Sequence, residues 1–275
     1  MSRKHLRAAL LTTVVCWLAI AVAAVACTGG GSDAETAPPT PSATTPTQSA
    51  TSSTEPASED LLPAKVLDLA NWKLTLPSGP ADDATEIEQP ELATFKNKFF
   101  QVDPKGDGVV FTAPAGGSTT SGSDYPRSEL REMTDNGRNE ASWSNRSGKH
   151  VMKVTQAITA VPKVKPHVVA GQIHDAEDDV VMVRLEGKRL FVEADGDEVG
   201  TLDTNYVLGT RFTVTITATP KGIDTTYKGH TVSYDKVGGG YYFKAGCYTQ
   251  SNTGQGDASD AAGTVVIYDL TVSHS

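Results

Sequence analysis

The stretch Arg211-Phe-Thr-Val-Thr-Ile-Thr-Ala218 alternates polar and apolar residues along its whole length. Its four apolar side chains fall on one side of an extended chain, and its arginine and threonines fall on the other. Because successive side chains of a β-strand point to opposite faces, this period of two predicts a strand with one buried face. Spacing typical of a helix is weak outside a short stretch near residues 90–95.

The same signal recurs on both sides of this strand and predicts many more strands. Alternation reappears in the C-terminal residues Val266, Tyr268, Leu270 and Val272, which are expected to share one face. A β-branched and aromatic run occurs at Val109-Val110-Phe111. Between residues 180 and 202, apolar runs are broken by Glu186-Gly187 and Asp195-Gly196, and such glycine-containing breaks favour tight hairpins. Many short strands in one domain predict an all-β fold, a sandwich or a jelly roll.

Residues 1–27 have the pattern of an export signal. Three cationic residues precede an apolar stretch of 19 residues, which ends in Ala23-Ala24-Val25-Ala26 directly before Cys27. Small residues before a cysteine that is followed by Thr-Gly-Gly-Gly-Ser resemble a bacterial lipoprotein cleavage site, where the cysteine becomes the lipidated first residue. Cleavage with release, or an uncleaved helix barely long enough to span a bilayer, is the alternative. We expect an exported protein, either secreted or held at the outer face of the cell membrane only through Cys27.

Residues 28–62 are predicted to be a disordered linker. They hold 14 Ser and Thr, 5 Pro and 3 Gly but no aromatic residue, so they cannot bury enough apolar surface to offset their chain entropy. Residues 63–275 are the predicted folded domain, long enough to bury roughly 70% of the surface of its unfolded chain. Cys247 is the only cysteine of this domain, so its stability is expected to come from the core.

The charge distribution indicates a local cleft for an acidic ligand. The chain carries a net charge of −9, and the folded domain carries −7 once the +3 of the signal and the −5 of the linker are set apart. This sign argues against a simple nucleic-acid binder. Residues 127–165 nevertheless hold eight Lys and Arg against four Asp and Glu, which fits a polyanion cleft. The acidic runs 175–179 and 257–260 lack the spaced ligands of a calcium loop, so no metal site is predicted.

Two segments carry polar residues that a strand would bring to one face. Arg127, Glu129 and Arg131 would project to the same side, where two guanidiniums flank one carboxylate and leave positive charge for an acidic ligand. A surface ion pair of little energetic value is the alternative. Gln172 and His174 also share a face, and the histidine can titrate near neutrality. A lone histidine near a turn is more often structural or solvated.

A third segment, residues 241–250, presents an aromatic and cationic face. If the segment is extended, that face holds Tyr242, Lys244, Tyr248 and Gln250. The opposite face holds Phe243, Ala245 and Cys247, so the cysteine is expected to be a core thiol rather than a nucleophile. Gly246 leaves a gap between Lys244 and Tyr248 where a ligand could approach. A half-exposed aromatic strand without a ligand is the alternative.

Four short motifs stand in order along the folded domain. They are Asn71-Trp-Lys-Leu-Thr-Leu-Pro77, Arg127-Ser-Glu-Leu-Arg-Glu132, Gln172-Ile-His174 and Tyr242-Phe-Lys-Ala-Gly-Cys-Tyr-Thr-Gln250. Together they closely resemble the alginate lyases of polysaccharide lyase family 7, from about residue 63 to the C-terminus. The resemblance implies a jelly-roll β-sandwich of two antiparallel sheets, a long open groove for an acidic polysaccharide, and chemistry without a cofactor. We expect the domain to act as a monomer.

The resemblance also implies a reaction. Alginate is a 1,4-linked polyuronate, and its cleavage by β-elimination removes the C5 proton and then the C4 oxygen. The neighbouring carboxylate must first be neutralised, which stabilises the enolate-like transition state. By analogy, Arg127, Gln172 and His174 surround that carboxylate. Tyr248 delivers a proton to the leaving oxygen, and His174 takes the C5 proton of guluronate. For mannuronate, Tyr248 serves as both base and acid.

The remaining candidate residues follow from the same resemblance. Residues that orient the site or hold neighbouring sugars are expected to be Glu129, Arg131, Tyr242, Lys244 and Gln250. The isoleucine between Gln172 and His174 is associated in the family with guluronate-containing substrate.

Three other functions compete with this interpretation. A glycoside hydrolase usually needs two carboxylates facing each other, but Glu129 and Glu132 have opposite strand parity. A non-catalytic surface carbohydrate-binding module would not need His174 and Tyr248 on the same wall as Arg127. A lyase for another polyuronate, such as glucuronan, stays open.

Overall fold

The computed structural model describes residues 61–275. The predicted signal peptide, with Cys27, and residues 28–60 of the predicted linker lie outside the described residues. Within the described part, no helix is long and apolar enough to cross a membrane. Besides strands, this part contains three short 3-10 helices: η2 (Pro63–Lys65), η3 (Glu91–Thr94) and η4 (Thr253–Gln255).

Ten strands form the first sheet. Its main path runs β12-β11-β10-β9-β16-β5-β1-β2, with β6 beside β5 and β7 beside β16. The bounds are β1 Trp72–Thr75, β2 Glu86–Ile87, β5 Arg127–Thr134, β6 Asn139–Glu140, β7 Trp143–Ser144, β9 His167–His174, β10 Asp179–Glu186, β11 Arg189–Ala194, β12 Asp197–Asp203 and β16 Gly239–Thr249.

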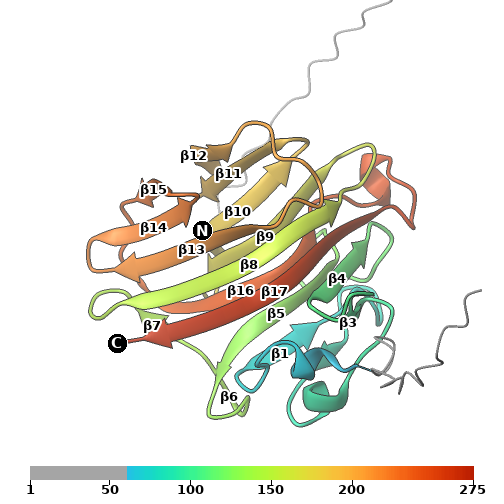
Figure 1. Ribbon diagram of the computed structural model, residues 1–275, viewed down its shortest axis with the longest axis horizontal. Helices are drawn as coiled ribbons and strands as arrows, with labels where there is room; N and C mark the ends of the chain where they lie inside the picture. The colour runs from blue at the N-terminus through green and yellow to red at the C-terminus, as the bar shows by residue number, and fades with distance from the viewer. Residues whose placement is uncertain (1–60) are drawn as a thin grey trace, which may run out of the picture. The chain divides into compact units, whose positions relative to one another are not determined.

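Seven strands form the second sheet, in the order β15-β14-β13-β8-β17-β4-β3. The bounds are β3 Phe100–Val102, β4 Val109–Pro114, β8 His150–Ala160, β13 Phe212–Thr219, β14 Gly222–Tyr227, β15 His230–Tyr234 and β17 Ala262–His274. Figure 1 shows β17, in red, between β8 and β4. Buried side chains from both antiparallel sheets form one core, which confirms the predicted all-β jelly-roll sandwich.

The strand that suggested the fold behaves as its sequence predicts. The four apolar side chains of β13 are at most 4% exposed, and the threonines between them are half-buried. Both predicted hairpins are also confirmed. Gly187 stands at the turn between β10 and β11, and Asp195-Gly196 connects β11 to β12. All three of these turn residues have positive φ, which glycine adopts readily and aspartate tolerates in turns.

The face predicted for the C-terminal strand is wrong in its first half. Val265 and Ile267 are fully buried in the core, whereas Tyr268 is only half-buried and its ring lies against the Arg211 guanidinium. The register of β17 against β8 shifts between Ile267 and Asp269. Such a bulge inserts an extra residue and reverses the parity, so that Leu270 returns to the core side.

The three predicted polar segments lie on neighbouring strands in the middle of the first sheet. β16 pairs with β9 on one side and with β5 on the other. In this register Lys244 lies opposite both Arg131 and Gln172. Tyr242 lies opposite His174, and Tyr248 lies opposite Arg127. Pairing of segments more than 40 residues apart therefore gathers the candidate side chains on one sheet face.

Candidate active site

A cavity of about 310 Å³ lies over this part of the first sheet. Seven of the nine candidate catalytic and substrate-binding residues line it: Arg127, Arg131, Gln172, His174, Tyr242, Lys244 and Tyr248. A second hollow of about 340 Å³ shares Arg131, Ala176 and Tyr242 with the first. The cavity is therefore one part of a longer groove, as an extended polymer requires.

Glu129 lies beneath this cavity and is fully buried. Its Oε1 accepts a hydrogen bond of 2.6 Å from Gln172 Nε2. Its Oε2 lies 2.8 Å from Lys244 Nζ and 3.3 Å from Arg127 Nη1. Burial disfavours the carboxylate, but the two cations outweigh it, and the pKa of Glu129 lies below its usual range. One buried anion thus holds three cavity-lining side chains in place.

Lys244 is held in the same buried network. Burial lowers the pKa of its ammonium to about 8, although the Glu129 carboxylate opposes this change. Nearby guanidiniums, those of Arg127 and Arg131, lower the Lys244 pKa further. The site therefore concentrates positive charge in a poorly hydrated place, where attraction to an acidic sugar is strong.

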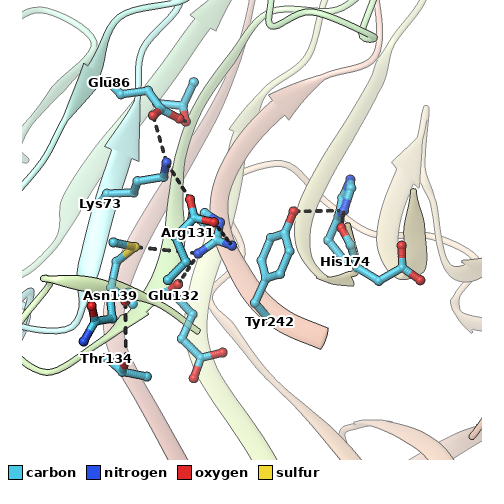
Figure 2. A network of polar contacts seen from close by, with 12 residues as sticks. Lys73, Glu86, Arg131, Glu132, Thr134, Asn139, His174 and Tyr242 are labelled. Carbon is cyan, nitrogen blue, oxygen red and sulfur yellow. Dashed lines mark hydrogen bonds and ion pairs between the residues drawn. The ribbon is translucent and has the colours of Figure 1, made fainter. Parts of the chain in front are cut away.

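His174 has one ring nitrogen, Nε2, with no hydrogen-bond partner among residues 61–275, and this nitrogen is suited to accept a proton. Its Nδ1 lies 2.6 Å from the Asp175 carbonyl oxygen, which can only accept, so Nδ1 carries the hydrogen and Nε2 the lone pair. Burial and the charge of Lys244 lower the pKa of His174 from 6.5. Figure 2 shows the Tyr242 hydroxyl directed at this ring, 3.1 Å from Nδ1, with the phenol between Arg131 and His174. The imidazole is thus oriented and neutral near pH 7.

Tyr248 is fixed from several sides. The Arg127 guanidinium carbon lies 3.9 Å from the centre of its ring, and the Tyr125 ring meets it edge-on. Its hydroxyl lies 2.9 Å from Ser123 Oγ. The ring is therefore held firmly while its hydroxyl faces the cavity, and the phenol can exchange a proton with a bound substrate.

Two buried polar atoms at the cavity are unpaired within residues 61–275. They are Arg127 Nε and Gln172 Oε1. Buried polar groups are nearly always hydrogen-bonded, so unpaired atoms on cavity-lining residues are typical of a site that binds a polar ligand.

Two candidates do not line the cavity. Glu129 acts from below through the residues it holds. Gln250 follows the end of β16, is 6% exposed, and is not among the cavity residues, so its substrate contact stays a prediction. Glu132 lies on the core face, where it accepts from Trp143 Nε1 and from the Phe243 amide. Glu129 and Glu132 therefore project to opposite faces of β5, as their spacing predicted, and cannot face each other as the two carboxylates of a hydrolase.

Gly246 has a different role from the predicted one. It has φ +145°, and a Cβ there would lie 2.6 Å from the Ser128 carbonyl oxygen and 2.7 Å from Glu129 Cα. The glycine therefore permits close packing of β16 on β5 rather than ligand approach, which corrects the prediction. Cys247 is buried as predicted, and burial raises the pKa of its thiol to about 12.

Sequence reasoning missed several residues of this site. Lys73 lies in the first of the four family motifs, but no role was predicted for it. In the structure it lies on β1, pairs with Arg131 and lines the cavity. Its ammonium contacts Glu86 at 2.8 Å (Figure 2) and Glu140 at 3.2 Å. Strand parity would have placed Lys73 on the right face once β1 was known to pair with β5. Ser123 lies in a loop, where no periodic pattern reports the direction of a side chain.

Comparison with known proteins agrees with this geometry. The alginate lyase family model matches residues 67–274. The structure of the alginate lyase AlgAT5, from polysaccharide lyase family 7, is 57% identical, with a TM-score of 0.76, over 78% of this chain and 99% of that one. The Corynebacterium sp. alginate lyase is 44% identical, with a TM-score of 0.76, over 80% and 100%. A complex of the family 7 alginate lyase A1-II′ with a substrate designated GGMG is 30% identical, with a TM-score of 0.68, over 80% and 98%.

These matches cover almost the whole described domain. The chain belongs to the alginate lyases of polysaccharide lyase family 7 and is a polysaccharide lyase.

Proposed function

We propose that this domain cleaves 1,4-linked alginate by β-elimination, leaving an unsaturated uronate at the new end, and that it prefers guluronate-containing blocks. One observation carries the proposal. A guanidinium, an amide, an imidazole and a phenol, from Arg127, Gln172, His174 and Tyr248, reach one cavity from three neighbouring strands.

The first step is neutralisation of the substrate carboxylate. The C5 proton is far too weakly acidic while the adjacent carboxylate keeps its full charge. Arg127 and Gln172 bind this group, and buried Lys244 adds a positive field. Because these donors are already held by Glu129, little reorganisation is needed as charge develops in the transition state.

The second step moves two protons and two electron pairs, and the pair of the C4–O4 bond leaves with O4. The lone pair of His174 Nε2 accepts the C5 proton of guluronate, and the electrons of the C5–H bond form the C4–C5 double bond. The C4–O4 bond breaks, and Tyr248 gives its hydroxyl proton to the departing oxygen. His174 then returns its proton to solvent and Tyr248 regains one, so no water is added to the sugar. For mannuronate, whose proton and leaving group lie on one side, Tyr248 performs both transfers.

The guluronate preference rests on two supporting observations. Ile173 is the isoleucine that the family resemblance associates with guluronate-containing substrate. It is fully buried and pairs with Phe243, so it would influence the preference by setting the positions of Gln172 and His174. The relative A1-II′ binds a substrate designated GGMG.

A product assay tests the reaction class. The domain is incubated separately with polyguluronate, polymannuronate and polyglucuronate, and ultraviolet absorbance of unsaturated ends is followed. We expect the fastest rise with polyguluronate. Cleavage without that absorbance would show hydrolysis, and a fastest rise with polyglucuronate would assign another polyuronate.

Variants test the assigned residues. Tyr248→Phe is expected to lose most turnover while it retains substrate binding. Arg127→Ala is expected to weaken both binding and turnover, because it removes charge that neutralises the carboxylate. Full activity in either variant would remove that residue from the mechanism.

We also propose that the chain is exported as a lipoprotein anchored through Cys27, and that its domain is a monomer. The cationic and apolar segment followed by small residues supports the anchor. Cys27→Ser should abolish lipid labelling in a bacterial host, and unchanged labelling would place the anchor elsewhere. Light scattering of the soluble domain should give a monomer mass, whereas a dimer mass would reject that part.

A further inference from the structure

Ser123 reaches the proposed acid from a different part of the chain. It lies in the loop before β5, and residues 120–123 of this loop line the cavity. Its Oγ lies 2.9 Å from the Tyr248 hydroxyl, across 125 residues of sequence. The loop is fixed where the Ser123 amide donates to the Thr120 carbonyl and where Thr120 bridges to Asp83. Ser123 is thus held against Tyr248 by the fold.

The hydrogen atoms around Ser123 Oγ can be counted. The Tyr125 amide donates to Oγ at 3.2 Å, and Oγ lies 3.2 Å from the Tyr125 carbonyl oxygen, which can only accept. The single hydroxyl hydrogen of Ser123 then points to this carbonyl. In that arrangement Oγ accepts the hydrogen of the Tyr248 hydroxyl, so the neutral phenol is oriented by the serine.

The same hydroxyl can support the opposite protonation state. When the phenolic hydrogen turns toward the leaving O4 of the sugar, the Ser123 hydrogen can rotate from the carbonyl to the phenolic oxygen. A hydrogen bond to an oxygen that gains negative charge is about twice as strong as one between neutral groups. The exchange gives up a 3.2 Å contact and gains a charge-assisted one at 2.9 Å.

We propose that Ser123 is a positioning residue that orients the Tyr248 hydroxyl and stabilises its oxygen while the proton moves to O4. This inference rests on the proposed acid role of Tyr248. The Tyr248 ring is already fixed by Arg127 and Tyr125, so rotation of the phenolic hydrogen is the remaining freedom, and Ser123 is placed to control it.

The test compares Ser→Ala changes at two places in one loop. Ser123→Ala should lower kcat about 10- to 100-fold, with KM changed less than about threefold. This loss is smaller than or equal to the lower end of the roughly 10²- to 10⁴-fold that a positioned acid–base group contributes, because Ser123 acts through Tyr248. Ser118 lies in the same loop as Ser123 but does not line the cavity, and its hydroxyl donates a 2.6 Å hydrogen bond to the Gly79 carbonyl. Ser118→Ala removes this bond and should leave kcat within about twofold of the original. Ser123→Thr keeps the hydroxyl and should retain kcat within about threefold of the original.

Each outcome bears on the inference. An equal loss of kcat in Ser123→Ala and Ser118→Ala would show that the loop as a whole matters and would overturn it. So would a raised KM with unchanged kcat, or a loss in Ser123→Thr as large as in Ser123→Ala. Full activity in Tyr248→Phe would instead reject the acid role itself. A normal Ser123→Ala beside an inactive Tyr248→Phe would reject only the role of Ser123.

Discussion

Replacing Glu129 by Gln tests the central electrostatic argument. The two side chains have nearly the same shape, so the change removes charge without opening a cavity. Glu129 is fully buried, and the side chains of Arg127 and Lys244 are 8% and 9% exposed. Removing the anion therefore leaves two cations together with little access to water.

The expected magnitude follows from that burial. Breaking a buried ion pair by removing one partner costs about 3–5 kcal/mol of unfolding free energy. For a domain of this size that corresponds to a fall of roughly 6–20 °C in Tm. The Glu129 carboxylate also raises the pKa of Lys244, so its loss should move that pKa below about 8. The alkaline limb of the pH–activity profile should therefore move to lower pH in this variant.

Glu86→Gln provides a matched control. It removes the carboxylate from a second Glu–Lys pair of the site, in which Glu86 and Lys73 also lie 2.8 Å apart. The Glu86 side chain is 41% exposed, so water screens the pair and its loss should cost no more than about 1 kcal/mol. Urea unfolding of both variants measures the difference. Equal losses in the two would refute the argument that buried Glu129 organises the site.

Three further predictions follow from the same contacts. The value of kcat/KM should decrease as the pH is lowered below 6.5, because the base His174, whose pKa lies below 6.5, becomes protonated. It should also decrease as the pH is raised above about 8, because Lys244 loses its charge. A flat profile from pH 5 to 9 would contradict both assignments. Gly246→Ala should lower the free energy of unfolding by about 1–3 kcal/mol, because the new Cβ would lie 2.6 Å from the Ser128 carbonyl oxygen. An unchanged urea midpoint would show that the alanine causes no strain at this position. Glu132→Gln should cost about 1–3 kcal/mol of stability while turnover stays within about threefold, since this carboxylate binds buried donors on the core face; a larger loss of turnover than of stability would give it a catalytic role.

Local pattern was enough to predict several strands and the grouping of side chains within most of them. The alternation in β13 and the shared face of Gln172 and His174 follow from the pleat, which depends only on neighbouring residues. The same reasoning placed Cys247 in the core. The four motifs were specific enough to indicate the family, which the comparisons confirm.

The pattern failed where the backbone departs from a regular strand. In β17, a bulge between Ile267 and Asp269 makes the expected face correct for Leu270 but wrong for the residues before the bulge. The positive φ of Gly246 directs its vacant side-chain position toward β5 rather than toward a ligand. Neither departure has a local signature in the alternation of residues, because both depend on the register with a neighbouring strand.

The sequence by itself determined that the chain has a β-rich domain and carries the family's motifs, since composition and side-chain period are local properties. Only the tertiary structure decided that β9, β16 and β5 lie side by side, that Glu129 is buried beneath Arg127 and Lys244, and that Ser123 meets Tyr248. Strand order, burial and loop contacts join residues far apart in the chain. They are set by the packing of the whole core, which no short stretch of sequence specifies.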